Sequence, residues 1–120
     1  MSGTFVLKSE KGRYRFILQD EGGKELFKGT LLTEKDRVVK YMDMMRESDD
    51  LTNNLQALVG PDGSHYFRGE LHTSKEGQKG VNADGTPLGF SATFKSEKEM
   101  EEVRQAVIKA AKGAAVKDET

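Results

Sequence analysis

The chain has 120 residues, 35% hydrophobic and 32% charged, and its 19 basic and 20 acidic side chains leave a net charge of -1. This length fits a single domain over residues 1–120, and the charge balance argues against a protein held to nucleic acid mainly by phosphate neutralisation. The absence of cysteine excludes disulfide bonds, thiolate catalysis and cysteine-ligated zinc. Because the sequence shows no signal peptide and no long apolar run, we expect a soluble, cytoplasmic protein without membrane contact.

Residues 1–30 predict a meander of antiparallel strands. Apolar and polar residues alternate over 5–10 and 13–18, which is typical of half-buried strands, and Lys11-Gly12 between them supplies a turn. Residues 20–23 tolerate a positive φ and predict a second turn. A third strand is then expected through Leu26 and Phe27.

The next segment predicts a helix from Thr33 to about Glu47. Thr33 offers a hydroxyl for capping the free backbone N–H groups, and Val38, Met42 and Met45 form one apolar stripe at helical spacing. Met42, Met44 and Met45 fit a soft metal site, an adaptable peptide-binding surface or flexible filling of a small core, and we favour the core. The polar residues 48–54 are expected to form a linker.

A second copy of this pattern follows. An offset of 63 residues superposes Gly22 on Gly85 and Phe27 on Phe90, whereas earlier in the half an offset of 51 superposes Phe16 on Phe67. The sequence therefore predicts repeat 1 over 4–48 and repeat 2 over 55–113. The second repeat carries about twelve extra residues, the difference between the offsets of 63 and 51, as an insertion near 72–83.

The second helix has the clearest ends. Ser96 and Glu99 fit a capping box, an apolar stripe runs through Met100, Val103, Val107 and Ala110, and Gly113 stands where a C-terminal cap belongs. We expect residues 114–120 to be frayed.

These motifs resemble the YegP-like family of small bacterial domains, many of them tandem repeats of unassigned function. The resemblance is carried by Gly12-Arg13-Tyr14-Arg15-Phe16-Ile17-Leu18, the Gly22-Gly23 turn, Leu26 and the Thr33 helix start, with a weaker copy at residues 63–67 and 84–85. It implies a compact α+β fold built from two repeats. It transfers no catalytic residue.

We therefore predict an α+β domain of two ββ(β)α repeats related by a pseudo-twofold, with antiparallel sheets covered by two amphipathic helices. Each repeat alone has too little core, so the two copies must associate. The candidate core residues are Phe5, Leu7, Phe16, Leu18, Leu26, Val38, Met42, Leu58, Phe67, Val103 and Val107.

Few residues suggest catalysis. His65 and His72 are the only histidines, and on a continuous strand Glu70 and His72 would share a face while His65 points to the other. A Glu70/His72 pair is thus a fragment of an acid/base or metal site, but no third ligand is visible, and we predict no metal, no cofactor and no enzyme activity. The glycines between Gly60 and Gly89 fit turns and a mobile hairpin tip better than a phosphate loop.

Basic and aromatic residues alternate in the first strands, as in proteins that stack nucleic-acid bases. The alternative binding face comprises Lys8, Arg13, Arg15 and Lys28. Strand alternation puts Arg13 and Arg15 opposite Tyr14 and Phe16, so the aromatics are better explained as core. Nucleic acid is for this reason the alternative partner.

The insertion interrupts the repeated plan with a long polar stretch, and such insertions lie on the surface where recognition is often built. Its candidate binding residues are Lys75, Glu76, Gln78, Lys79 and Asn82. The alternative is a tolerated insertion without a role. The leading hypothesis is a non-enzymatic binding or regulatory module, monomeric or weakly dimeric, that contacts another protein through this arm or through an open sheet edge.

Overall fold

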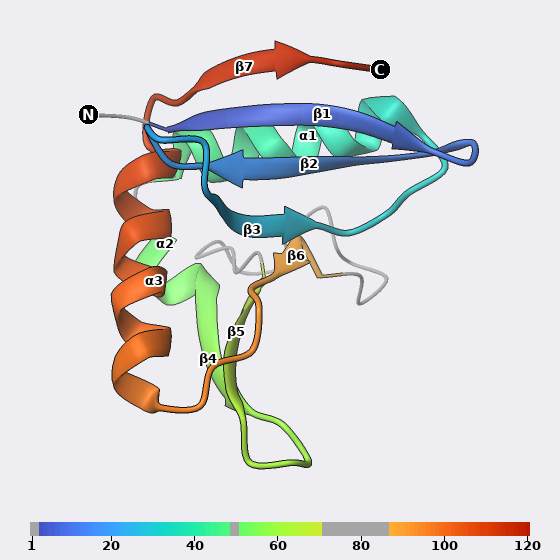
Figure 1. Ribbon diagram of the computed structural model, residues 1–120. Helices are drawn as coiled ribbons and strands as arrows, with labels where there is room; N and C mark the ends of the chain where they lie inside the picture. The colour runs from blue at the N-terminus through green and yellow to red at the C-terminus, as the bar shows by residue number, and fades with distance from the viewer. Residues whose placement is uncertain (1–2, 49–50, 71–86) are drawn as a thin grey trace, which may run out of the picture.

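The computed structural model describes residues 3–48, 51–70 and 87–120. The elements follow in the order β1 (Thr4–Glu10), β2 (Arg13–Gln19), β3 (Glu25–Gly29), α1 (Lys35–Glu47), α2 (Leu51–Asn54), β4 (Leu55–Val59), β5 (His65–Gly69), β6 (Gly89–Phe90), α3 (Glu97–Ala111) and β7 (Ala115–Asp118). Figure 1 shows α1 running along β1 and β2, and α3 descending beside the β4–β5 hairpin. The α+β class is confirmed.

All the strands join one seven-stranded sheet in the order β4-β5-β6-β3-β2-β1-β7. Neighbouring strands are antiparallel except β7, which lies parallel to β1. The sheet is therefore mixed, not wholly antiparallel as predicted, and the strands of the two halves meet edge to edge at β3 and β6.

The predicted N-terminal meander is confirmed, and local chemistry explains its turns. Lys11 and Gly12 have φ of 48° and 81°, a left-handed pair that matches the twist of a two-residue hairpin. Gly23, with φ of 87°, turns the chain between β2 and β3. The first hairpin sets Leu7 opposite Phe16 and directs both into the core.

The two long helices begin differently. Ser96 caps α3 by accepting a hydrogen bond from the Glu99 N–H at 3.1 Å, as predicted. The prediction that Thr33 caps α1 is wrong: the N-cap residue is Glu34, and no side chain there accepts a backbone N–H. The start of α1 is held instead by burial of Val38, the first residue of a buried stripe that continues through Tyr41 and Met45.

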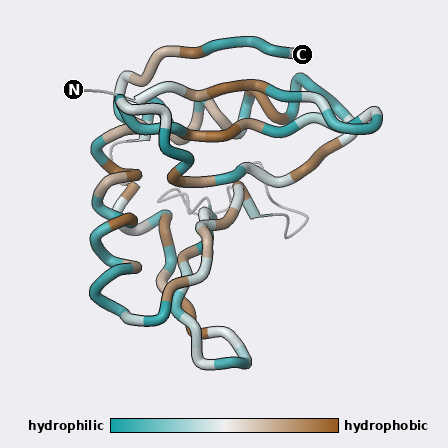
Figure 2. The backbone as a smooth tube through the Cα atoms, in the orientation of Figure 1, coloured by the Kyte–Doolittle hydropathy of each residue, from teal (hydrophilic) through white to brown (hydrophobic). Residues whose placement is uncertain are grey.

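One hydrophobic cluster contains buried side chains of α1, α3 and the strands. Phe5, Phe16, Phe27 and Phe67 form a chain of ring contacts within it, with centroids 5.4, 6.3 and 5.9 Å apart. Both helices thus cover the same sheet face. Figure 2 shows hydrophobic residues concentrated on the central strands and on the helix turns that face them. Of the predicted core residues, all are buried except Val103 and Leu58. Val103 is partly buried against the cluster. Leu58 is partly buried on the opposite sheet face, because its neighbour Ala57 is the one that pairs with the core residue Phe67.

Three strand glycines make room for these rings. Gly29, Gly89 and Gly69 lie directly opposite one another on β3, β6 and β5. A Cβ at Gly29 would lie 2.5 Å from the Phe16 ring, and a Cβ at Gly69 would lie 3.0 Å from the Phe27 ring. The prediction that the glycines between Gly60 and Gly89 serve only turns and a hairpin tip is therefore wrong for Gly69 and Gly89.

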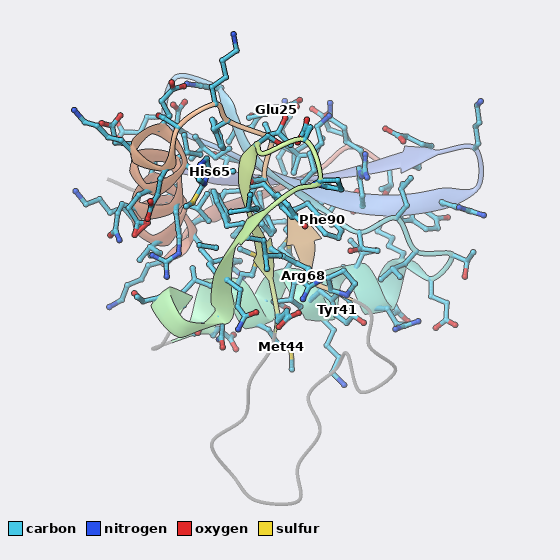
Figure 3. All side chains as sticks on the ribbon, turned by 90° about the horizontal axis from the view of Figure 1, so that it is seen from below. Glu25, Tyr41, Met44, His65, Arg68 and Phe90 are labelled. Atoms are coloured by element: carbon cyan, nitrogen blue, oxygen red, sulfur yellow. The ribbon has the colours of Figure 1, made fainter. Side chains whose placement is uncertain are left out.

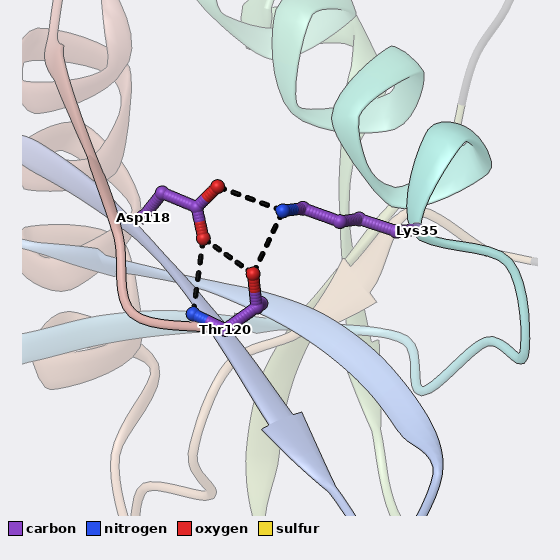
Figure 4. Close-up of polar contacts among 3 residues, drawn as sticks. All are labelled: Lys35, Asp118 and Thr120. Atoms are coloured by element: carbon purple, nitrogen blue, oxygen red, sulfur yellow. Dashed lines mark hydrogen bonds and ion pairs between the residues drawn. The ribbon is translucent and has the colours of Figure 1, made fainter.

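The C-terminal residues 114–120 are ordered rather than frayed. Gly113 ends α3 with φ of 67°, and β7 then pairs with β1, which satisfies backbone groups that an edge strand would leave open. Lys35 Nζ lies 2.7 Å from both Asp118 Oδ2 and Thr120 Oγ1, joining the end of β7 to the start of α1 (Figure 4). The hydrogen bond from Lys35 and, after it, those that the Thr120 hydroxyl and backbone N–H donate to Asp118 Oδ1 hold the pKa of Asp118 well below its usual range.

The internal repeat and its pseudo-twofold stay a prediction. Outwards from the β3–β6 seam, the strands follow as β6, β5 and β4 in one half and as β3, β2 and β1 in the other. The halves nevertheless differ in detail. Phe27 is buried whereas Phe90, superposed on it by the 63-residue offset, is 42% exposed. The second hairpin also has a longer turn, closed by Gly60 N–H donating to Ser64 O, and Asp62 in this turn has its pKa lowered mainly by the Ser64 hydroxyl.

The expected linker, residues 48–54, contains the short helix α2. Leu51 is buried in the core, and the Asn54 amide donates to Ser48 Oγ at 3.2 Å. Within this segment, α2 therefore packs against the domain. Within the described ranges, no helix is long and apolar enough to cross a membrane.

Candidate functional site

The four basic residues predicted as an alternative binding face lie on one side of the sheet. Lys8 is directly opposite Arg15, and Ile17, two residues along β2, is opposite Lys28. Phe16, between Arg15 and Ile17, is buried in the core. Alternation therefore places the basic residues on the face opposite the helices, as predicted.

This second face is mixed in charge and only partly accessible. Glu10 lies opposite Arg13 in the register, and Glu25 Oε1 is 3.9 Å from Lys28 Nζ. At its centre Val6 and Ile17 are only 3% and 4% exposed. The accessible basic groups thus lie around the centre of the face.

Of the predicted Glu70/His72 pair, only Glu70 lies within the described residues. Glu70 forms an ion pair with Arg68, and its backbone N–H donates to Asn54 O at 2.7 Å. His65 is paired through its backbone with Phe94. His72 and the insertion residues Lys75, Glu76, Gln78, Lys79 and Asn82 lie outside the described residues. Among the described residues, no group of three His, Cys, Asp or Glu side chains could hold a metal ion.

A pocket of about 780 Å³ opens beside β3. Residues 24–31 form one wall, residues 90–92 and Phe94 form the other, and Val103 of α3 and Arg15 of β2 complete the lining. The pocket exists because β6 pairs with β3 at only two positions, Lys28 with Phe90 and Gly29 with Gly89, before the chain turns away towards β5. Its apolar lining is typical of ligand sites.

Phe90 and Arg68 also lie on the sheet face opposite the helices. Phe90 lies between Lys28 of β3 and Arg68 of β5, directly opposite both in the sheet. Figure 3 shows the neighbouring positions of Phe90 and Arg68. The Nε atom of Arg68 is buried without a hydrogen-bond partner, although its guanidinium also contacts Glu70. Phe90 is thus an exposed ring next to two cationic side chains.

The β4 strand forms the other edge of the described sheet. Its sequence, Leu-Gln-Ala-Leu-Val, carries no charge, and Val59 at its end is 63% exposed. The opposite edge, β7, carries Lys117 and Asp118 and is tied to Lys35. Charged side chains discourage pairing at an edge, so β4 is the edge less protected against an added strand.

The hydrogen-bond register shows which β4 groups point outwards. His65 and Phe67 direct their backbone groups away from β4, because His65 exchanges bonds of 2.8 and 2.7 Å with Phe94 and Phe67 O accepts from the Ser91 N–H. Their β4 partners, Val59 and Ala57, therefore direct their own N–H and C=O groups away from β5.

The same alternation turns the backbone of Leu55 outwards, but its carbonyl is covered. Leu55 O accepts a hydrogen bond from Arg104 Nε of α3 at 2.9 Å. Arg104 also donates to Thr52 O and lies 2.9 Å from Glu101. Within the part of the chain that the structure describes, the open part of this edge is thus at Ala57 and Val59.

Sequence reasoning missed the pocket and the exposure of Phe90, and it named an open sheet edge without identifying it as β4. The pocket lining comes from separate segments that no local pattern links. Phe90 was equated with buried Phe27 in the repeat alignment, and the missed signal was Gly89 beside it, which marks close backbone approach in a strand. The lack of charge in residues 55–59 was visible in the sequence.

Comparisons with solved structures find the same fold. The solution NMR structure of yegP from E. coli, a protein of unknown function, superposes with a TM-score of 0.82 at 22% identity, over 100% of this chain and 95% of that one. UPF0339 protein SO3888 from Shewanella oneidensis gives a TM-score of 0.80 at 18% identity, over 98% of this chain and 92% of that one. No family model matches the sequence, and no curated protein does either.

These similarities extend over the whole chain, from β1 to β7, so they concern the complete sheet and its helices. At such low identity they establish the architecture and carry no residue role. The predicted resemblance is thereby confirmed at the level of structure: this chain has the YegP-like fold.

Proposed function

We propose that the protein is a non-enzymatic binding module that pairs an extended, uncharged segment of another protein with the β4 edge. The observation that carries the proposal is the pair of outward-facing backbone units at Ala57 and Val59, on a strand without any charged side chain. Adding a strand to such an edge is a common mode of peptide recognition. We expect this module to act in the cytoplasm.

The exposed edge also sets the strength of the contact. Two residues offer four backbone groups, and each hydrogen bond contributes only about 0.5–1.5 kcal/mol net. The exposed Val59 side chain adds apolar contact on one face. The binding is therefore expected to be weak and reversible, and the partner segment is expected to be apolar, because the strand offers no charge to pair with.

The test compares three variants with the intact protein in capture from an extract of the native host. Val59→Lys places a charge on the open edge, and Val116→Lys makes the same change on β7, where Val116 is 42% exposed. In the third variant a short Gly-Ser turn replaces residues 73–83. The captured protein is then purified, and hydrogen exchange is measured on the complex.

We expect one partner to bind the intact protein, Val116→Lys and the loop replacement but not Val59→Lys, and to protect the amides of Ala57 and Val59. Retention of that partner by Val59→Lys overturns the proposal. Loss in the loop replacement alone assigns binding to the insertion arm and refutes the edge. Sedimentation of the intact protein as a dimer that Val59→Lys dissociates would identify a second copy as the occupant and likewise refute it.

A second candidate function is nucleic-acid binding on the face opposite the helices. What favours it is the exposed Phe90 ring between Lys28 and Arg68, with Lys8 and Arg15 on the same face. Aromatic rings flanked by cations stack single-stranded bases. Fluorescence anisotropy with a labelled single-stranded oligonucleotide should then show affinity that falls steeply with salt and is weakened by Arg15→Gln. Absence of binding at low salt rejects this function.

A further inference from the structure

The pocket beside β3 has walls suited to an apolar body. Its volume of about 780 Å³ lies within the range of sites that hold small organic ligands. Apolar side chains dominate the lining, namely Leu26, Phe27, Leu31, Phe90, Phe94 and Val103. Phe90 is 42% exposed, so its ring is available to a ligand rather than used by the core.

The neutral polar groups of the pocket are already engaged. The Thr30 hydroxyl donates to Pro87 O at 2.7 Å. The Ser91 hydroxyl donates to Ala92 O at 2.7 Å and accepts from the Phe67 N–H at 2.9 Å. A sugar or another ligand rich in hydroxyls would find no free hydroxyl donor among these lining residues.

The remaining polar recognition comes from cations. Arg15, Lys24 and Lys28 line the pocket with a single acid, Glu25, among the described lining residues. Arg15 donates its Nε–H to Gly29 O at 3.2 Å, which fixes the guanidinium and leaves its terminal nitrogens for a ligand. A planar guanidinium fits a carboxylate with two parallel hydrogen bonds.

We propose that this pocket binds a small organic carboxylate with an apolar, aromatic body. The carboxylate lies at Arg15 and Lys28, and the apolar part lies against Phe90 and Leu31. The site is separate from the β4 edge, so it goes beyond the proposed protein contact and can stand or fall independently of it.

The test is a titration of the full-length, isotope-labelled protein with 2-naphthoate at pH 7, followed by backbone amide chemical shifts. The uncharged 2-naphthamide has the same ring system and serves as the matched ligand. With naphthoate we expect saturable amide shifts in residues 24–31 and 90–94. Naphthamide should bind at least about tenfold more weakly.

Two matched variants separate local contact from general attraction. Arg15→Gln should weaken naphthoate binding about tenfold and leave naphthamide nearly unchanged, because a charge-assisted bidentate contact is lost. Arg13→Gln removes the same charge from the same strand outside the pocket lining, and should have little effect. Phe90→Ala should weaken both ligands alike. Thermal unfolding of each variant verifies its fold.

The proposal is overturned if naphthamide binds as tightly as naphthoate, if Arg13→Gln weakens binding as much as Arg15→Gln, or if the shifts map elsewhere. Absence of saturation up to millimolar ligand overturns it as well. Val59→Lys should leave naphthoate binding unchanged, so a failure at the β4 edge is distinguishable from a failure here.

Discussion

Gly89 is the position where a single added methyl group tests the seam between the two halves of the sheet. A Cβ there would lie 2.3 Å from Lys28 O, 2.7 Å from Cε2 of Phe27 and 2.8 Å from the Gly29 Cα. Two of these three neighbours are backbone atoms that no rotamer change can move. Gly89→Ala must therefore push β6 away from β3.

The cost follows from packing rather than from backbone conformation. Gly89 is not among the glycines with positive φ, so alanine can adopt its φ and ψ. Overpacking of a tight core costs about 1–3 kcal/mol, and β6 pairs with β3 at only two positions, so displacement also endangers ladder hydrogen bonds. We expect a loss of about 3 kcal/mol and a fall in Tm of roughly 10 °C.

Urea unfolding followed by far-ultraviolet circular dichroism measures this loss, with Gly22→Ala as the control. At Gly22 the nearest atom to an added Cβ is Asp20 Oδ1 at 3.5 Å, an ordinary contact, and φ is not positive. This control should change stability by less than about 1 kcal/mol. Equal stabilities of the two variants would refute the close approach of β6 and β3.

Three further results are expected. Ser96→Ala should destabilise the protein by about 1 kcal/mol, because the α3 cap is lost. Thr33→Ala should have almost no effect, because no side chain caps α1. Denaturant midpoints measure both changes, and a larger loss for Thr33→Ala would show that the cap assignment is wrong. Asp118→Asn should lower Tm at pH 7, and the difference from the parent should shrink as pH falls below the ordinary carboxyl pKa of 3.8. The difference shrinks in this direction because a carboxyl whose pKa is lowered on folding stabilises the fold while ionised and loses that effect on protonation. A difference in Tm that stays constant down to pH 2 would contradict this prediction. Removal of residues 114–120 should lower the free energy of unfolding by at least about 2 kcal/mol, because the β7 hydrogen bonds and the buried Ala114 are lost. It should also expose the β1 amides to hydrogen exchange. Unchanged exchange would place β7 outside the cooperative unit.

Local patterns were sufficient for much of the fold. The alternation over residues 5–18 and the left-handed residues Lys11 and Gly12 specify the first hairpin within a few residues of chain. The apolar stripe of α3 and its Ser96 cap likewise act within one or two helical turns. Such interactions join residues that are near in sequence, which is why the sequence alone predicts them.

The candidate sites were predicted less completely. The basic face followed from alternation, since residues two apart on a strand share a side. The pocket required the divergence of β6 from β3 and the approach of α3, and the open groups of Ala57 and Val59 required the register of β4 on β5. Both depend on pairings between distant segments.

What the sequence by itself determined was the identity of the locally coded elements and which of their faces are apolar. Tertiary structure decided the fate of residues 114–120, whose pattern is not that of a strand but which pair with the otherwise open edge of β1. It likewise decided that Gly29, Gly69 and Gly89 lie in one row, because rings from β2 and β3 need the space that side chains would fill. Those outcomes depend on hydrogen-bond groups and volumes supplied by remote parts of the chain.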